Sequence, residues 1–130
     1  MKILFTGFIV CVLCHNFCCA QQIKSDSVYQ ILKGKWYEEK DPRSKLIFYK
    51  KSIREYYKGV KGISTLSYII TNKCCDSSLI STKGIGLYLK ETDRKGIVYC
   101  YVIMSISENS LELVYSGGRF LALRRESVSK

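Results

Sequence analysis

The sequence predicts an all-β protein, namely a closed eight-stranded antiparallel up-and-down β-barrel with a short N-terminal helix. Ile, Val, Tyr, Phe and Thr dominate eight segments, and Gly, Asn, Asp and Ser fill the short gaps between them. Short gaps between segments of this length indicate an antiparallel meander. Because an open meander exposes unpaired backbone groups at both margins, closure into a barrel is favoured. An interior formed by about eight strands is either filled by side chains or holds one small ligand.

The helix is expected in the segment "SDSVYQIL", before the first strand. Val28, Ile31 and Leu32 have the spacing of three and four residues that is typical of one apolar helical face. Ser25 or Ser27 is expected to cap the helix start, because both side chains can accept a hydrogen bond from the first turn. Gly34 is expected to end it, since glycine readily adopts the left-handed conformation found at helix ends.

The strands are expected at residues 35–40, 45–51, 53–59, 63–71, 85–91, 97–106, 111–116 and 119–126. The segment "KGIG" before the fifth strand is interpreted as a turn and not as a phosphate-binding loop, because a strand follows it. The fourth and sixth strands are apolar on both faces, so a neighbouring element must cover them from outside. The N-terminal helix is the expected cover.

The first twenty residues have the pattern of a secretory signal peptide. Lys2 precedes the apolar run "ILFTGFIVCVL", and the small residues of "FCCA" indicate cleavage after Ala20. A membrane anchor would need roughly 20 apolar residues, and polar residues interrupt this run. We therefore expect a signal peptide at 1–20 and a single domain at 21–130, secreted or periplasmic and monomeric.

The residue inventory argues against an enzyme. The one histidine, His15, lies in the predicted leader, which excludes Ser-His-Asp and Cys-His triads and His-ligated zinc sites from the mature chain. Glu38 and Glu39 should point to opposite faces of a strand, and the aspartates fall in turns. We therefore expect no catalytic residues, no metal and no cofactor.

Three cysteines follow the leader: Cys74 and Cys75 in the loop "NKCCDSS", and Cys100 in the sixth strand. In an oxidising compartment, three thiols commonly give one disulfide and one free thiol. Cys100 is therefore expected to bond either Cys74 or Cys75 and to tie the loop to the sheet. A zinc or redox site is not expected, because two adjacent thiols without histidine make a poor metal site.

Trp36, the only tryptophan, is expected to close one end of the barrel. Trp buries a large area, and its indole N–H can reach a backbone carbonyl. Gly34, two positions earlier, would let the preceding helix approach closely. Arg125, or Arg124 if the register differs by one, would lie over the indole as a cation–π partner.

The combination of these two chain ends resembles the small secreted lipocalin-like domains of bacteria, within the lipocalin and calycin superfamily. The matching residues are Leu32, Gly34 and Trp36 at the front, and Leu123 and Arg125 at the back. The resemblance covers the chain from the first of these residues to just beyond the last. The resemblance implies a barrel fold. It also implies binding of a small apolar or amphipathic molecule, which is the usual activity of the family.

The charge favours an alternative function. Without Lys2, the chain has 20 basic and 11 acidic residues, a net charge of +9. A filled barrel with a basic surface would be an interaction module for anionic lipid, polysaccharide or a protein partner. Nucleic acid is not an expected partner, because the protein is predicted to be secreted.

Overall fold

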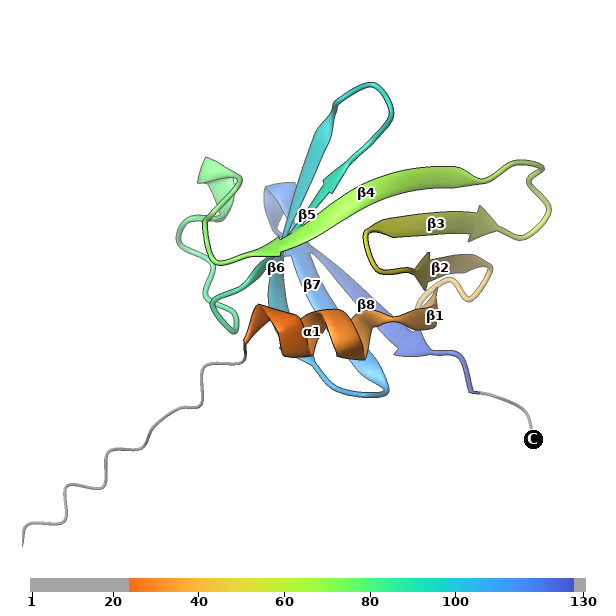
Figure 1. Cartoon of the computed structure of the whole chain (residues 1–130), viewed down its shortest axis with the longest axis horizontal. Helices are drawn as coiled ribbons and strands as arrows, with labels where there is room; N and C mark the ends of the chain where they lie inside the picture. The colour runs from red at the N-terminus through yellow and green to blue at the C-terminus, as the bar shows by residue number, and fades with distance from the viewer. Residues whose placement is uncertain (1–23, 128–130) are drawn as a thin grey trace, which may run out of the picture.

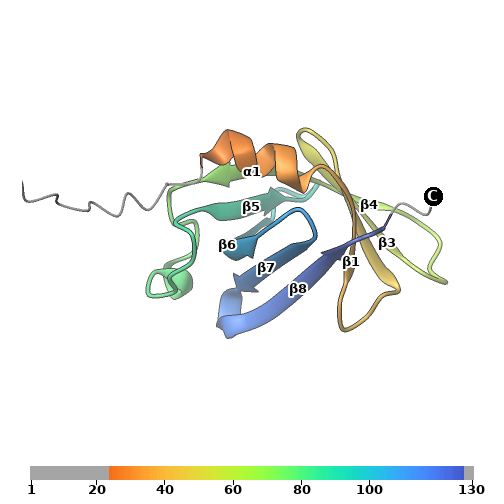
Figure 2. The same ribbon diagram turned by 90° about the horizontal axis from the view of Figure 1, so that it is seen from below.

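The computed structural model describes residues 24–127 and shows a closed barrel of eight antiparallel strands in sequence order (Figure 1 and Figure 2). The predicted fold class is thus confirmed. Each strand pairs with its successor, and the last pairs with the first. The predicted signal peptide, residues 1–20, lies outside the described residues. Within the described part of the chain, no helix is both long and apolar enough to cross a bilayer.

The helical elements are α1 (Ser25–Leu32) and two single-turn 3-10 helices, η1 (Ser77–Leu79) and η2 (Ser116–Gly118). The strands are β1 (Gly34–Glu38), β2 (Ser44–Phe48), β3 (Ser52–Tyr57), β4 (Ser64–Thr71), β5 (Tyr88–Thr92), β6 (Val98–Ile106), β7 (Ser110–Tyr115) and β8 (Arg119–Arg125). All eight predicted strands are present, with small differences at their ends.

Both ends of α1 differ from the sequence prediction. Lys24 occupies the N-cap position and no side chain caps the helix, so neither Ser25 nor Ser27 has that role. Gly34 is already the first residue of β1, with φ of +124°. A Cβ on Gly34 would lie 2.7 Å from Nη1 of Arg125. The glycine therefore makes room for this guanidinium at the start of β1.

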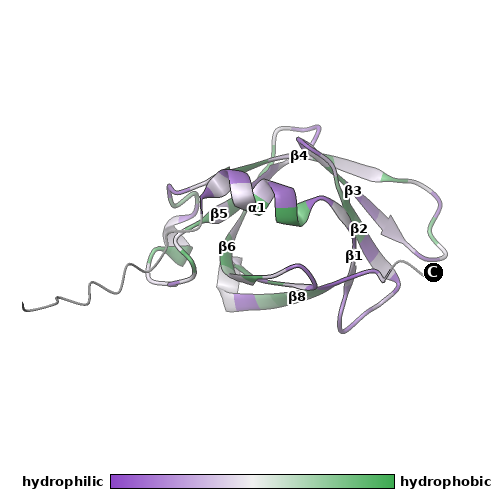
Figure 3. Cartoon of the chain, turned by 60° about the horizontal axis from the view of Figure 1, so that its bottom comes forward, coloured by the Kyte–Doolittle hydropathy of each residue, from purple (hydrophilic) through white to green (hydrophobic). Residues whose placement is uncertain are grey.

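The main core fills the barrel end that α1 covers. Val28 and Leu32 are fully buried against Trp36 and against strand residues such as Ile53 and Leu111. Figure 3 shows α1 lying across this end of the barrel. Because both helical residues share one apolar face, burying it closes the barrel end and also stabilises a helix too short to be stable alone.

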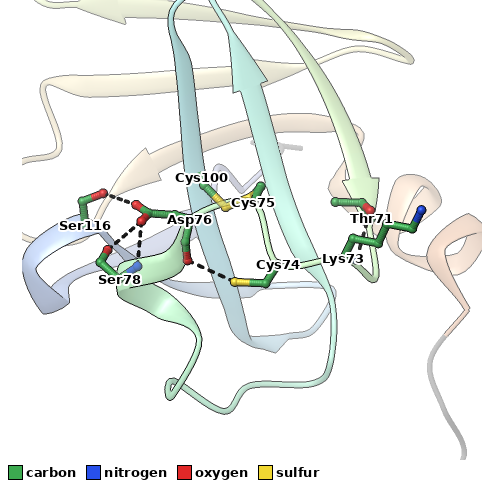
Figure 4. The surroundings of a disulfide bond; sticks show 8 residues. All are labelled: Thr71, Lys73, Cys74, Cys75, Asp76, Ser78, Cys100 and Ser116. Carbon is green, nitrogen blue, oxygen red and sulfur yellow. Dashed lines mark hydrogen bonds between the residues drawn. A yellow bond between two sulfur atoms is a disulfide. The ribbon is translucent and has the colours of Figure 1, made fainter.

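A different element covers the outside of β6, so the predicted helical cover is wrong for this strand. Leu79 of η1 packs on Cys100 and Val102, whose side chains point out of the barrel. A disulfide joins Cys75 of the same loop to Cys100 (Figure 4), and Cys74 is a free, exposed thiol. The disulfide closes a loop with a sequence separation of 25 residues, which typically contributes about 2–4 kcal/mol.

The same loop returns to the barrel through a close backbone approach at Gly84. A Cβ there would lie 2.1 Å from the carbonyl oxygen of Ile103. The neighbouring Ile85 N–H donates to that oxygen at 2.9 Å, and the Ile103 N–H donates to Leu87 at 3.0 Å. Only glycine fits this contact, so the Gly-rich "KGIG" segment has a structural role in joining the loop to β6.

Candidate ligand-binding cavity

Trp36 forms the floor of the barrel. Its side chain is fully buried, and its indole N–H donates to the Leu32 carbonyl at 2.8 Å. That carbonyl belongs to the last residue of α1, where helix geometry leaves acceptors without intrahelical partners. The indole thus fills the space between the strands and also provides one hydrogen bond to the helix end.

Arg125 completes this closed end. It lies opposite Trp36 in the β1–β8 register, and its guanidinium carbon is 4.3 Å from the indole centroid. The guanidinium also donates to three backbone carbonyls: Ile31, Lys33 (2.8 Å) and Glu108. Because two of these acceptors lie at the C-terminal end of α1, the positive charge is also favourably placed in the helix dipole.

Arg124 points to the other side of β8, away from the indole. Its Nε lies 3.3 Å from a carboxylate oxygen of Glu39, with both side chains nearly half exposed. Such surface ion pairs contribute little to stability. Of the two arginines that the sequence offered as partners of the indole, the structure therefore places Arg125 over Trp36.

The opposite end of the barrel is open and holds a cavity of about 610 Å³. Its apolar wall includes Leu46, Leu113, Leu121 and Leu123. The β3–β4 loop, residues 58–63, contributes Val60, Lys61 and Ile63 to the rim. A volume of this size is typical of small-molecule pockets, which are mostly apolar with a few polar groups that orient the ligand.

Three glutamates from alternate strands also line this cavity. We call Glu38, Glu55 and Glu91, on β1, β3 and β5, the glutamate cluster. Each follows a fully buried core residue by two positions: Trp36, Ile53 and Leu89. Since alternate residues of a strand share a face, the three carboxylates enter the barrel one level above the apolar floor.

Burial changes the acidity of this cluster. Glu91 is only 4% exposed, and desolvation together with the nearby charge of Glu55 raises its pKa to about 8. The Tyr101 hydroxyl opposes this rise in part by hydrogen bonding. Desolvation also raises the pKa of Glu55. Glu91 is therefore mostly protonated at neutral pH.

No basic side chain neutralises the cluster. The ion pairs found among residues 24–127 are Asp41–Arg43, Lys45–Glu126 and Glu39–Arg124, none of which includes a cluster glutamate. The one basic residue among those that line the cavity is Lys61, which lies in the exposed rim loop. In the part of the chain that the structure describes, no three His, Cys, Asp or Glu side chains are gathered closely enough to hold a metal ion.

Sequence reasoning missed the glutamate cluster. It separated Glu38 from Glu39 by strand alternation, and the structure agrees, since Glu38 lines the cavity while Glu39 pairs with Arg124 outside. It did not connect Glu38 with Glu55 and Glu91, which are far away in sequence. The available signal was a glutamate two positions after an apolar residue in three alternate strands.

A second hollow, of about 800 Å³, lies outside the barrel between α1 and β4. Lys33, Lys50 and Lys51 line it together with one acidic residue, Asp26, and Ile69 in its lining is 50% exposed. Tyr29 connects the two elements, because its hydroxyl accepts a hydrogen bond from the Ile70 N–H at 2.7 Å. We call these three lysines and Ile69 the basic groove.

Comparison with known proteins identifies no relative. No protein-family model matches the chain, and neither the curated proteins nor the solved structures give a significant match. Any function assigned to the barrel must therefore be argued from the geometry of its cavity.

Proposed function

We propose that this protein is a secreted or periplasmic, non-enzymatic lipocalin-like carrier that binds one small apolar or amphipathic molecule in its barrel. The observation that carries the proposal is a cavity of about 610 Å³, open at one end and lined by leucines. The plug formed by Trp36 and Arg125 at the other end is the arrangement that the family resemblance implied.

The balance of the lining supports binding over catalysis. Burying a ligand against the leucine wall yields roughly 25 cal/mol for each Å² of apolar surface removed from water. The described residues include no histidine, the commonest general base in enzymes. The signal-like leader and the disulfide Cys75–Cys100 support an oxidising, extracytoplasmic location.

Filling the cavity should abolish ligand binding. We expect the neutral dye Nile red to bind the wild-type protein at one saturable site, and Leu121→Trp to weaken this binding at least about tenfold, because the indole would occupy the cavity. Leu121 lines the cavity, whereas its neighbour Phe120 is half exposed on the outer face. Phe120→Trp is therefore a matched control that should bind normally.

Fluorescence titration measures both affinities, and circular dichroism verifies that each variant keeps its β-sheet content. Failure of the wild-type protein to bind the dye, or equal binding by the wild-type protein and Leu121→Trp, would contradict binding in the cavity.

A second candidate function is attachment to an anionic lipid surface through the basic groove. The observation that favours it is the grouping of Lys33, Lys50 and Lys51 around the exposed Ile69. Lysines near an anionic surface gain about 1 kcal/mol each, and an apolar side chain among them can contact the acyl region.

This attachment should depend on salt and on the groove. We expect co-sedimentation with vesicles containing phosphatidylserine at low ionic strength and its loss at about 0.5 M salt, where exposed charges are screened. Lys50→Glu with Lys51→Glu should abolish it. Arg94→Glu with Lys95→Glu, an adjacent exposed pair in the β5–β6 turn, makes the same charge change away from the groove and should retain most of the binding. If both double variants lost vesicle binding equally, the binding would depend on the net charge of the protein and not on the basic groove.

A further inference from the structure

We propose that the cavity selects an amphipathic organic cation, a molecule with an apolar body and a protonated amine that lies among Glu38, Glu55 and Glu91. The inference rests on the proposed carrier function and specifies the chemistry of the ligand. It is carried by the convergence of three carboxylates on one cavity of about 610 Å³.

The sign of charge inside the barrel is opposite to that of the whole chain. The protein carries a formal charge of +10, yet three carboxylates line the cavity against one lysine on the rim loop. Clefts lined by one sign of charge concentrate ligands of the opposite sign. A cavity adapted to a fatty-acid carboxylate would instead present basic groups, and here that ligand would meet three glutamates.

Glu91 is the most informative member of the cluster. A carboxyl group that is 4% exposed costs free energy when ionised unless a cation or hydrogen-bond donors compensate for its lost hydration. The Tyr101 hydroxyl supplies one hydrogen-bond donor to Glu91, but the described residues place no basic side chain in an ion pair with it. An ammonium group would supply both the missing charge and up to three donors.

The remaining lining determines what kind of cation fits. Leu46, Leu113, Leu121 and Leu123 require an apolar body beside the charged group. A bare metal ion fits poorly, because it would need ligands gathered around one point, and the described residues form no such group. An alkylammonium ion satisfies the wall and the carboxylates together.

Binding of such a cation should release a proton. The pKa of Glu91 is raised to about 8 in the empty cavity, mainly by desolvation and by the charge of Glu55, so the group must lose its proton to pair with the ammonium. Affinity should therefore rise between pH 6 and pH 8. The charged and titratable side chains that line the cavity with Glu91 or lie beside it in the sheet are Glu38, Glu55, Tyr56, Tyr57, Lys61, Tyr68, Tyr99 and Tyr101.

The test compares three probes with the same chain by isothermal titration calorimetry: octylammonium, octanol and octanoate. The amine remains protonated between pH 6 and pH 8. We expect octylammonium to bind at least about tenfold more tightly than octanol, in line with a hydrogen bond to a charged group, and octanoate to bind most weakly. The measured heat should vary with the ionisation enthalpy of the buffer, which reports the released proton.

Glu91→Gln should reduce octylammonium binding about tenfold and leave octanol binding unchanged, since glutamine keeps the shape and removes the charge. Glu39→Gln is the matched control, because Glu39 directly follows Glu38, just beyond the end of β1, but pairs with Arg124 outside the barrel. If Glu91→Gln does not fold, the relative affinities of the wild-type protein for octylammonium, octanol and octanoate still test whether the cavity selects a cation.

Equal affinities for octylammonium and octanol, or tightest binding of octanoate, would overturn the inference and leave the carrier function in place. Displacement of octylammonium by calcium at the same site would overturn it in favour of a metal site. If neither the three probes nor Nile red binds, the carrier function itself fails.

Discussion

Replacing Trp36 with alanine is expected to lower the free energy of unfolding by about 3–5 kcal/mol, the range for removing a fully buried aromatic side chain. The indole is completely buried, donates to the Leu32 carbonyl at 2.8 Å and supports the guanidinium of Arg125. Its removal leaves a cavity below the helix and an unsatisfied acceptor at the helix end. Both losses act on the same junction of α1, β1 and β8.

Urea unfolding followed by far-ultraviolet circular dichroism measures this change, since the variant has no tryptophan fluorescence. Trp36→Phe should be intermediate, because it retains an aromatic ring but loses the hydrogen bond. Arg124→Ala, on the outer face of the same strand pair, should stay within about 0.5 kcal/mol of the wild-type protein. If Trp36→Ala lowered the free energy of unfolding by less than about 1 kcal/mol, the indole would not be the packed plug that closes this end of the barrel.

The folded protein is expected to lose stability as the pH rises from 5 to 8. The pKa of Glu91 is about 8 in the folded protein, against an ordinary value of 4.5. Between these values the unfolded chain releases this proton while the folded chain retains it, so raising the pH favours unfolding. The stabilisation is fully present below pH 4.5 and is lost by about pH 8. At about 1.4 kcal/mol per pH unit, the loss amounts to roughly 2–4 kcal/mol.

Thermal unfolding at pH 5, 6.5 and 8 tests this expectation. Glu91→Gln should flatten the dependence and be more stable than the wild-type protein at pH 8. Glu108→Gln, on the exposed β6–β7 turn, should preserve the wild-type slope. Below pH 4 the trend should reverse, because Arg43 and Tyr57 lower the pKa of Asp41 to about 2. A flat wild-type profile between pH 5 and 8 would contradict the buried, protonated state of Glu91.

The strand pattern of this barrel could be predicted because its signals are local. Alternation and turn residues located all eight strands, and the need to satisfy sheet edges favoured closure. The ends of α1 could not be predicted in this way. Ser25 and Ser27 are good caps in general, but the position of the helix is determined by burial of Val28 and Leu32 and by the guanidinium of Arg125.

Choices between adjacent residues needed three-dimensional information. Neighbouring strand residues point to opposite faces, so the choice between Arg124 and Arg125 depends on the β1–β8 register. The choice between Cys74 and Cys75 depends on how the loop crosses the outside of β6, where Cys75 faces Cys100. A sequence alone provides neither of these.

The glutamate cluster illustrates a further difficulty. Each carboxylate in it looks like an ordinary solvent-facing strand residue when its strand is considered alone. Their common position follows only when the inward face of β1 is known from Trp36 and is carried around the sheet through the register, from Trp36 to Leu46 and from Leu46 to Glu55. Three strands had to be compared at once.

The contact between Trp36 and Arg125 also has a kinetic consequence. These partners are separated by most of the folded chain, and Arg125 additionally contacts Ile31, 94 positions away. Contacts between residues so distant in sequence carry a large loop-closure entropy and slow the folding reaction. Synthesis of the last strand, β8, must therefore be complete before the barrel can close, because β8 pairs with β1.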